Sequence, residues 1–506
     1  MMNWKKIVAL DDLPALIGHL WKNPGTRRTW AIPLLSSIAL FIVFKYCYPS
    51  ANFMPDSYPY MEAAALNADV NMWPVGYSKF LRLVSVFSHS DLVLVSIQFL
   101  YLKIATFAFL LTIIHLVQPR RLIKNLLLVI AVVEPLSLYL ANYISADALF
   151  TATSLCWFST LLWLHFRPRV YLLPLHAFFL LGCFVLRYNA IFYPVISVAT
   201  LWFSRSSLRF RLSGFVLILV PIAYSYLFTV SETRQQTDVS TYSPFAGWQL
   251  ANNALTMYEH IPDERRVPAP PALATFDSFV LRHLDTLDRV RKTEGDSLAG
   301  IFYLWSAHGP LVAYMNQRFK DDTTSSLYKK WAKMSVLYGQ YGRFLVRQYP
   351  LSYIQFYLLP NAIRYALPAP EFLLTYNLGA DSVKPIGRSW FQLYPGKVSH
   401  RFDPLLQRKA IRWYTLGSLL INLSEVLLVL SLVMFRTTPL PQTLRSLAML
   451  TAVFWLLNAM FSIAASPVVL RYQYFPLLIL LTVQCIYFET LYRFQDKQTP
   501  ILKPAI

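Results

Sequence analysis

Long apolar runs recur along this 506-residue chain and constrain its fold more than any other feature. An α-helix needs about 20 consecutive apolar residues to cross the hydrocarbon core of a membrane. We predict about ten such helices, with the sixth the shortest. They cover residues 30–49, 91–117, 122–141, 145–165, 170–187, 190–204, 208–230, 413–435, 443–464 and 468–491. Only 14% of the side chains are charged, which excludes an ordinary soluble domain and favours an all-α polytopic membrane protein.

The positive charges predict which ends of these helices face the cytoplasm. Lys and Arg gather in alternate connections, at residues 5–28, 120–124, 167–169, 205–211, 436–445 and 493–503. The short connections on the other side hold only Lys79, Arg82, Arg187 and Arg471. Basic loops stay cytoplasmic in membrane proteins, so we expect both chain ends inside. This topology accounts for the net charge of +20 without a nucleic-acid partner.

The chain divides into five expected segments along this topology. They are a cytoplasmic interfacial segment (1–29), an N-terminal transmembrane module with an outer loop at 50–90 (30–230), an extracytoplasmic domain (231–411), C-terminal transmembrane helices (412–492) and a cytoplasmic tail (493–506). Within the third segment, apolar residues from Leu327 to Leu345 repeat at intervals of three and four. This period predicts a helix, so we expect the long loop to form a helical subdomain.

A carboxylate at a membrane surface is the first candidate for chemistry. Asp56 lies in the segment Asn52–Tyr58, which directly follows the first apolar run. In this position it can accept a proton from a hydroxyl while the bilayer holds a lipid-borne reactant. The structural alternative is that Asp56 only N-caps a short helix over residues 58–66.

Two further segments on the same predicted face carry charged residues. Asp147 lies in Tyr143–Phe150, where it could instead support a helix N-terminus beside Ser145. Arg471 and Tyr472 lie in Ser466–Pro476, between the last two runs.

The arginines on this face have two possible roles. Arg187, with Arg471, suits a phosphate because a guanidinium offers its oxygens a planar fork. The alternative for both arginines is that they reach toward lipid headgroups.

A carboxylate also occurs inside the third apolar run. Glu134 precedes Pro135, and an ionisable group at membrane depth is expected to be functional or paired. Lys103 in the second run is a possible partner, and a structural pair and a catalytic role both stay open.

Several of these segments, in this order, resemble the GT-C class of integral membrane glycosyltransferases. The match consists of an outward Asp56 with Tyr58 two residues on, a Pro-Val-Gly-Tyr segment ending at Tyr77, the Ser145–Asp147 turn and the Arg471–Tyr472 segment. The class includes the protein O-mannosyltransferases and the lipid A aminoarabinose transferases, which take a sugar from a polyprenyl phosphate. Many members carry an acidic pair in the first outer loop. Here Ser57 follows Asp56, so Glu62 or Asp69 would have to supply the second carboxylate.

The resemblance implies an inverting sugar transfer to an acceptor hydroxyl. Asp56 would act as general base with Asp147 as a second catalytic carboxylate. The substrates would contact Arg471, Tyr472, Arg187, Tyr58, Tyr77 and Glu62. The expected partners are a polyprenyl-phosphate sugar, a glycan, lipid or protein acceptor, and membrane lipids. The expected location is the bacterial inner membrane, with the site on its periplasmic face.

No cofactor is required by this chemistry, and the scattered histidines show no metal-ligand spacing, although dependence on a divalent metal stays open. Two other functions also stay open. A lipid-linked glycan ligase or polymerase would use residues of the long loop, namely Arg343, Arg347, Arg364 or His308. A transporter or flippase would use the intramembrane charges, but no internal repeat supports one.

Overall fold

The computed structural model of the chain describes residues 12–284, 300–394, 396–402, 404–434 and 440–498. Within these ranges the chain is helical, and extended residues meet only in three isolated bridges. Eight of the described helical segments are long and apolar enough to cross a membrane. They are α3 (Pro24–Cys47), α6 (Asp91–Val117), α7 with α8 (Arg121–Val133 and Leu136–Asn142), α9 (Ala146–Phe166), α12 (Leu208–Thr237), α22 (Pro404–Met434), α23 (Gln442–Ala465) and α24 (Leu470–Gln498). The protein is therefore a multi-pass helical membrane protein.

Ten full-length spans are not confirmed, because the fifth and sixth predicted spans are short. α10 (Leu172–Leu186) has 15 residues and α11 (Tyr193–Trp202) has 10, joined by η1 (Tyr188–Phe192). At about 1.5 Å per residue, neither reaches the thickness of the hydrocarbon core. The ends of α10 and α11 that are distant from η1 nevertheless lie close together, against Gly214 of α12. A Cβ added to Gly214 would touch both Leu173 of α10 and Leu201 of α11. Hydropathy along the sequence does not detect the irregular turn at Arg187. The predicted fifth and sixth spans were therefore longer than α10 and α11.

The long loop contains a helical unit with its own apolar core. Its helices are α13 (Pro244–Tyr258), η2 (Asp263–Arg265), α14 (Pro271–Leu284), α16 (Phe302–Trp305), α17 (Pro310–Arg318) and α18 (Leu327–Gln348). α18 contains the apolar repeat found in the sequence. It packs closely on α13, where the rings of Trp248 and Trp331 stack at 3.8 Å. Gly247 permits this approach, because a Cβ there would lie 2.0 Å from the carbonyl oxygen of Ser335.

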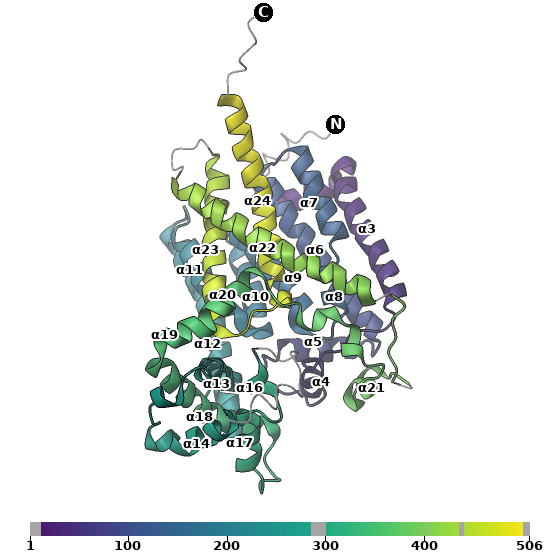
Figure 1. Cartoon of the computed structure of the whole chain (residues 1–506). Coiled ribbons are helices and arrows are strands. Elements are labelled where there is room, and N and C mark those ends of the chain that lie inside the picture. Colours follow the sequence, from purple (N-terminus) through teal and green to yellow (C-terminus); the bar gives the residue numbers. More distant parts are fainter. Residues whose placement is uncertain (1–11, 285–299, 395, 403, 435–439, 499–506) are drawn as a thin grey trace, which may run out of the picture.

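The two ends of the helix bundle differ in what they carry. Figure 1 shows the start of α3 and the end of α24 at one end of the bundle and α13, α14, α17 and α18 at the other. The same end as the helical unit carries α4 (Ser57–Ala65), α5 (Gly76–Ser85) and α21 (Pro385–Phe391). Between the unit and the last spans, the chain runs through α19 (Pro350–Tyr353), the π-helical turn η4 (Ile354–Leu358), α20 (Leu359–Ala366), η5 (Glu371–Leu374) and η6 (Tyr376–Gly379).

The orientation in the membrane is a prediction that cysteine labelling tests. Thr324 is exposed on the helical unit, and Val170 is exposed in a loop that we expect to be cytoplasmic. We expect Thr324→Cys to react with an impermeant maleimide on intact cells and Val170→Cys to react only after permeabilisation. The unmodified protein, with its four natural cysteines, supplies the background. The reverse pattern would invert the topology and move the site to the cytoplasmic face.

Candidate active site

A short parallel bridge sets the spacing of the first two candidate carboxylates. Asn52, after α3, pairs with Tyr143, just before α9. The backbone amide of Ile144 donates to the carbonyl oxygen of Asn52 at 3.0 Å. Asp56 and Asp147 each follow their bridge residue by four positions. The pairing therefore brings two segments that are distant in sequence into register.

A second parallel bridge sets the spacing of a carboxylate and an arginine. Ala369 pairs with Val469, and the amide of Leu470 donates to the carbonyl oxygen of Ala369 at 2.8 Å. Glu371 and Arg471 each follow their bridge residue by two positions.

The loop that leads into the second bridge is held by one side chain. The buried amide of Asn361, on α20, donates to the carbonyl oxygens of Ile463 and Ser466 at 2.7 and 2.8 Å. The oxygen of the same amide accepts from the amide of Val468 at 2.9 Å. These three hydrogen bonds fix the segment of chain that precedes Arg471.

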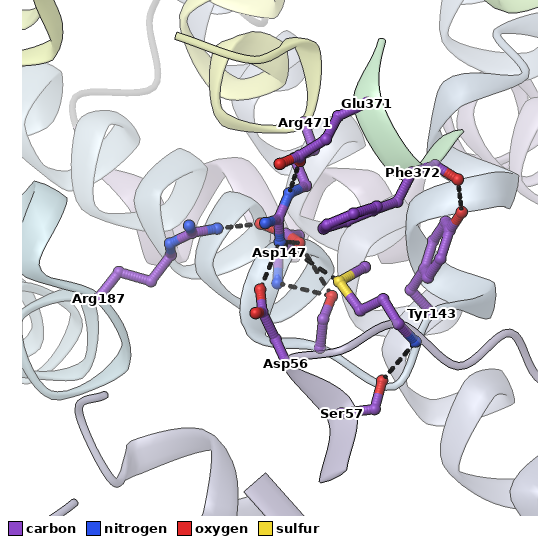
Figure 2. A network of polar contacts seen from close by, with 10 residues as sticks. Asp56, Ser57, Tyr143, Asp147, Arg187, Glu371, Phe372 and Arg471 are labelled. Atoms are coloured by element: carbon purple, nitrogen blue, oxygen red, sulfur yellow. Dashed lines mark hydrogen bonds and ion pairs between the residues drawn. The ribbon is translucent and has the colours of Figure 1, made fainter. Parts of the chain in front are cut away.

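The guanidinium of Arg471 lies at the centre of the site, as Figure 2 shows. Its Nε is 2.9 Å from Oε2 of Glu371. Its Nη1 lies 3.0 Å from Oδ2 of Asp56 and 3.2 Å from Oδ2 of Asp147. The sulfur of Met54 lies 3.3 Å from the same nitrogen. The side chain is only 5% exposed, so nearly all of its charge is balanced by protein groups.

Arg187 joins this group from the end of α10. It forms an ion pair with Oδ1 of Asp147, whose other oxygen accepts from the Ser145 hydroxyl at 2.9 Å. The guanidinium carbons of Arg187 and Arg471 lie 4.2 and 4.6 Å from the ring centre of Tyr472. Among the described residues, Asp147 is the only polar partner of Arg187, bound through Nη1. Arg187 is 14% exposed and keeps N–H groups for a further anion.

We call Asp56, Asp147, Arg187, Glu371 and Arg471 the charged cluster. Its three carboxylates and two guanidiniums leave one formal negative charge unbalanced. Burial raises the pKa of Glu371 above its ordinary value, against the opposing effect of Arg471. Glu371 also has a φ of +48°, a conformation that is strained for a residue with a side chain and that clusters at functional sites.

The structural alternatives describe these residues only in part. Asp56 occupies the N-cap position of α4, but its side chain makes no capping hydrogen bond. At α9 the structural alternative holds, since Ser145 caps the helix and Asp147 lies in its first turn, but the Asp147 carboxylate also pairs with both arginines. A buried Arg471 bound to three carboxylates is not reaching for lipid headgroups.

Of the other sequence candidates, Tyr472, Tyr58 and Tyr77 lie near the site, and Glu62 forms no ion pair with the charged cluster among the described residues. Tyr58 is half-buried, with the ammonium of Lys384 4.7 Å from its ring centre. Tyr77 is fully buried, and its hydroxyl donates to Gln98 at 2.7 Å, which is a packing role.

Neither candidate for a second loop carboxylate supplies one. Glu62 is exposed on α4, and Asp69 pairs with Lys79 at 2.7 Å on the surface. The carboxylates that join Asp56 come instead from Asp147 and Glu371.

Glu134 is buried but has partners other than Lys103. Its two oxygens accept from the hydroxyls of Tyr414 and Tyr474, each at 2.5 Å, and from the amide of Ser137. Lys103 donates to the carbonyl oxygen of Ala131 at 2.7 Å, and no ion pair joins it to Glu134 in the described chain. Lys103 and Glu134 therefore form no direct ion pair, because the hydroxyls of the two tyrosines take up the carboxylate oxygens.

Glu371 is the member of the cluster that the sequence interpretation missed. A usable signal exists, since Glu371 is the only acidic residue between Asp322 and Asp381 and lies in a segment rich in aromatic and aliphatic side chains. A single carboxylate in such a segment needs a cation or a water-filled site. The described residues contain no group of three or more His, Cys, Asp or Glu side chains arranged to hold a metal ion.

No protein-family model matches this chain, and no curated protein or solved structure does either. The function therefore has to be inferred from the site itself.

The raised pKa of Glu371 has a consequence for stability. A carboxyl whose pKa is raised on folding stabilises the protein below its unfolded value, near 4.5, and this contribution is lost as the pH rises through the folded value. Gln at position 371 is neutral at every pH. We expect the unfolding temperature of the wild type to fall relative to Glu371→Gln as the pH rises from below 4.5 to neutral.

Thermal unfolding of both proteins in detergent measures this difference, with the exposed Glu62→Gln as matched control. A constant difference, or a gain by the wild type, would contradict the assignment of a raised pKa to Glu371.

Proposed function

We propose that the protein is a membrane glycosyltransferase of GT-C-like architecture that transfers a sugar from a polyprenyl phosphate to an acceptor hydroxyl. One observation carries the proposal: Asp56, Asp147, Arg187 and Arg471, from four separate stretches of sequence, meet in one buried cluster at the end of the bundle next to the helical unit. On this proposal, α10 and α11 complete ten passes and leave both chain ends in the cytoplasm.

Asp56 is the best general base in the cluster. Its side chain is 19% exposed, against 14% for Glu371 and 1% for Asp147, which is also bound to both guanidiniums. A base must reach the hydroxyl whose proton it takes, which favours the more accessible carboxylate. Asp147 then holds Arg187 and Arg471 in place without touching the acceptor.

Arg187 is the best ligand for the donor phosphate. Arg471 already binds three carboxylates, so a phosphate would have to displace one of them. Arg187 is more exposed and has further N–H groups to donate. Arg471 contributes positive charge beside the phosphate and fixes Asp56.

In the proposed reaction, the acceptor oxygen attacks the anomeric carbon as its proton passes to Asp56. The bond from that carbon to the phosphate oxygen breaks, and its electron pair leaves on the polyprenyl phosphate. The guanidiniums stabilise the departing charge. One displacement inverts the anomeric configuration and needs no covalent sugar intermediate.

The two alternative functions receive no comparable support. Arg343, Arg347, Arg364 and His308, which a ligase or polymerase would use, make no ion pair with the charged cluster in the described residues. Glu134 and Lys103, which a transporter would use, are each bound within the bundle.

Replacing the base tests the reaction. We expect Asp56→Asn to lower turnover by on the order of a hundredfold to ten-thousandfold, because the amide keeps the shape of Asp56 but cannot accept the proton. The measurement is transfer of radiolabelled sugar from polyprenyl phosphate to a panel of acceptors. Asp69→Asn, which breaks an exposed ion pair, is the matched control and should keep full activity. Full activity in a well-folded Asp56→Asn protein would end the assignment of the base.

The two arginines should respond differently to lysine. We expect Arg187→Lys to raise the donor KM, because an ammonium cannot meet two phosphate oxygens with one planar fork. We expect Arg471→Lys to lower the unfolding temperature as well, because one ammonium cannot bind Glu371 on one side and Asp56 on the other as the guanidinium does.

Donor titrations and thermal unfolding of both variants separate these effects, with Arg318→Lys, at an exposed site on α17, as control. An unchanged donor KM in Arg187→Lys would move the phosphate site away from this residue.

A further inference from the structure

A cavity of about 510 Å³ opens beside the segment that carries Asp56. Phe53, Met54, Pro55 and Tyr58 form one wall, and the chain from Asn377 to Arg388 forms the other. The two walls belong to elements that pack together, since α21 lies against α4 (Figure 1). The cavity therefore borders the residues on both sides of the proposed base. Met54 belongs to both sites, because its sulfur contacts Arg471.

The charge of this cavity is opposite to that of the charged cluster. Lys384 and Arg388 are the charged side chains among its lining residues, and no carboxylate lines it in the described chain. The charged cluster beside it has an excess of negative charge. A cavity with two cations and no acid attracts an anion, and its aromatic wall suits an apolar or sugar face of the same molecule.

The cationic wall is held in place by local geometry. Nε of Arg388 donates to the carbonyl oxygen of Val383 at 2.7 Å. The chain folds around this side chain at Gly396, whose φ is +81° and where a Cβ would lie 2.6 Å from Cδ of Arg388. Among the described residues only Nε of Arg388 donates a hydrogen bond to the backbone, which leaves its terminal N–H groups to donate to a ligand.

The wall from Asn377 to Arg388 is also hydrogen-bonded to the segment that carries Asp56, the proposed base. Asn377 and Leu378 both have positive φ, and the amide of Asn377 donates to Oδ1 of Asn52 at 2.8 Å. Asn52 is also the bridge residue that positions Asp56. The cavity and the base are therefore fixed relative to each other by one asparagine. Consecutive strained residues of this kind persist only where the surrounding contacts hold them.

We propose that this cavity is the acceptor subsite and that the acceptor carries an anionic group, a phosphate or a carboxylate, which binds Lys384 and Arg388. This inference rests on the proposed function, because Arg187 already offers a separate place for the donor phosphate. A soluble sugar and a lipid are two sources of such an anion, and both present the same chemistry to the two cations. The hydroxyl to be glycosylated would then be presented on the Asp56 side of the cavity.

A labelling experiment tests the subsite without turnover. Ser382 is exposed and lines the cavity, whereas none of the four natural cysteines does. The rate at which Ser382→Cys reacts with a maleimide is measured with glucose 1-phosphate, with glucose, and in nanodiscs of phosphatidylglycerol or phosphatidylcholine. At ten times its Kd a ligand should slow labelling about tenfold, because the rate follows the unoccupied fraction.

Protection by glucose 1-phosphate but not glucose would support a soluble anionic acceptor. Protection only in phosphatidylglycerol nanodiscs would support a lipid-borne one. Protection should disappear in Lys384→Gln and in Lys384→Gln/Arg388→Gln. It should persist in Lys409→Gln/Arg412→Gln, which removes two exposed charges from α22 outside the cavity. No protection by either anion, equal protection by glucose, or protection that survives Lys384→Gln would overturn the proposal.

The same experiment in Asp56→Asn separates this inference from the proposed function. Anion protection that persists in this variant, together with no sugar transfer by the wild type in any assay, would leave the anion site standing and remove the transferase. Sugar transfer by the wild type without anion protection would remove only the subsite.

Discussion

The burial of the Arg471 guanidinium is the interaction on which the end of the bundle next to the helical unit depends. Taking a charge of this size out of water costs several kcal/mol unless oppositely charged groups surround it. Asp56, Asp147 and Glu371 supply those groups from the loop after α3, the start of α9 and the start of η5. Each carboxylate in turn needs the arginine. Segments separated by hundreds of residues are therefore held to one point, and the two parallel bridges set the register in which they arrive.

This end of the molecule holds two neighbouring sites that differ in charge. The charged cluster has one unbalanced negative charge, and Asp56 is its most exposed member, at 19%, followed by Arg187 and Glu371 at 14% each. The neighbouring cavity carries two cations and no acid. A base flanked by two separate anion-attracting positions fits a reaction with two anionic substrates, one that loses its phosphate and one that receives the sugar. Neither position requires a metal ion for the chemistry described.

Much of the helical architecture and most of the cluster could be predicted from the sequence, because both rest on local patterns. Hydrophobic periodicity reports helices such as α18, and a charge at the end of an apolar run, such as Arg471, is unfavourable without a role. Contacts between distant segments leave no such pattern. Glu371 was missed because its partner lies 100 residues away, and the hydrogen-bond partner of Lys103 could not be predicted because the sequence does not tell which face of a helix meets which neighbour. The lengths of α10 and α11 depend on a turn that hydropathy does not register.

The central claim is that the charged cluster binds the phosphate of a polyprenyl carrier beside Asp56. A structure of the protein in a nanodisc with polyprenyl phosphate bound tests it most directly. The phosphate is expected within about 3 Å of the Arg187 guanidinium, with Asp56 facing the side on which the sugar is attached. A phosphate bound elsewhere would contradict the claim, for example near Arg167 and Arg169 in the cavity at the end of the bundle away from the helical unit, with the cluster unchanged.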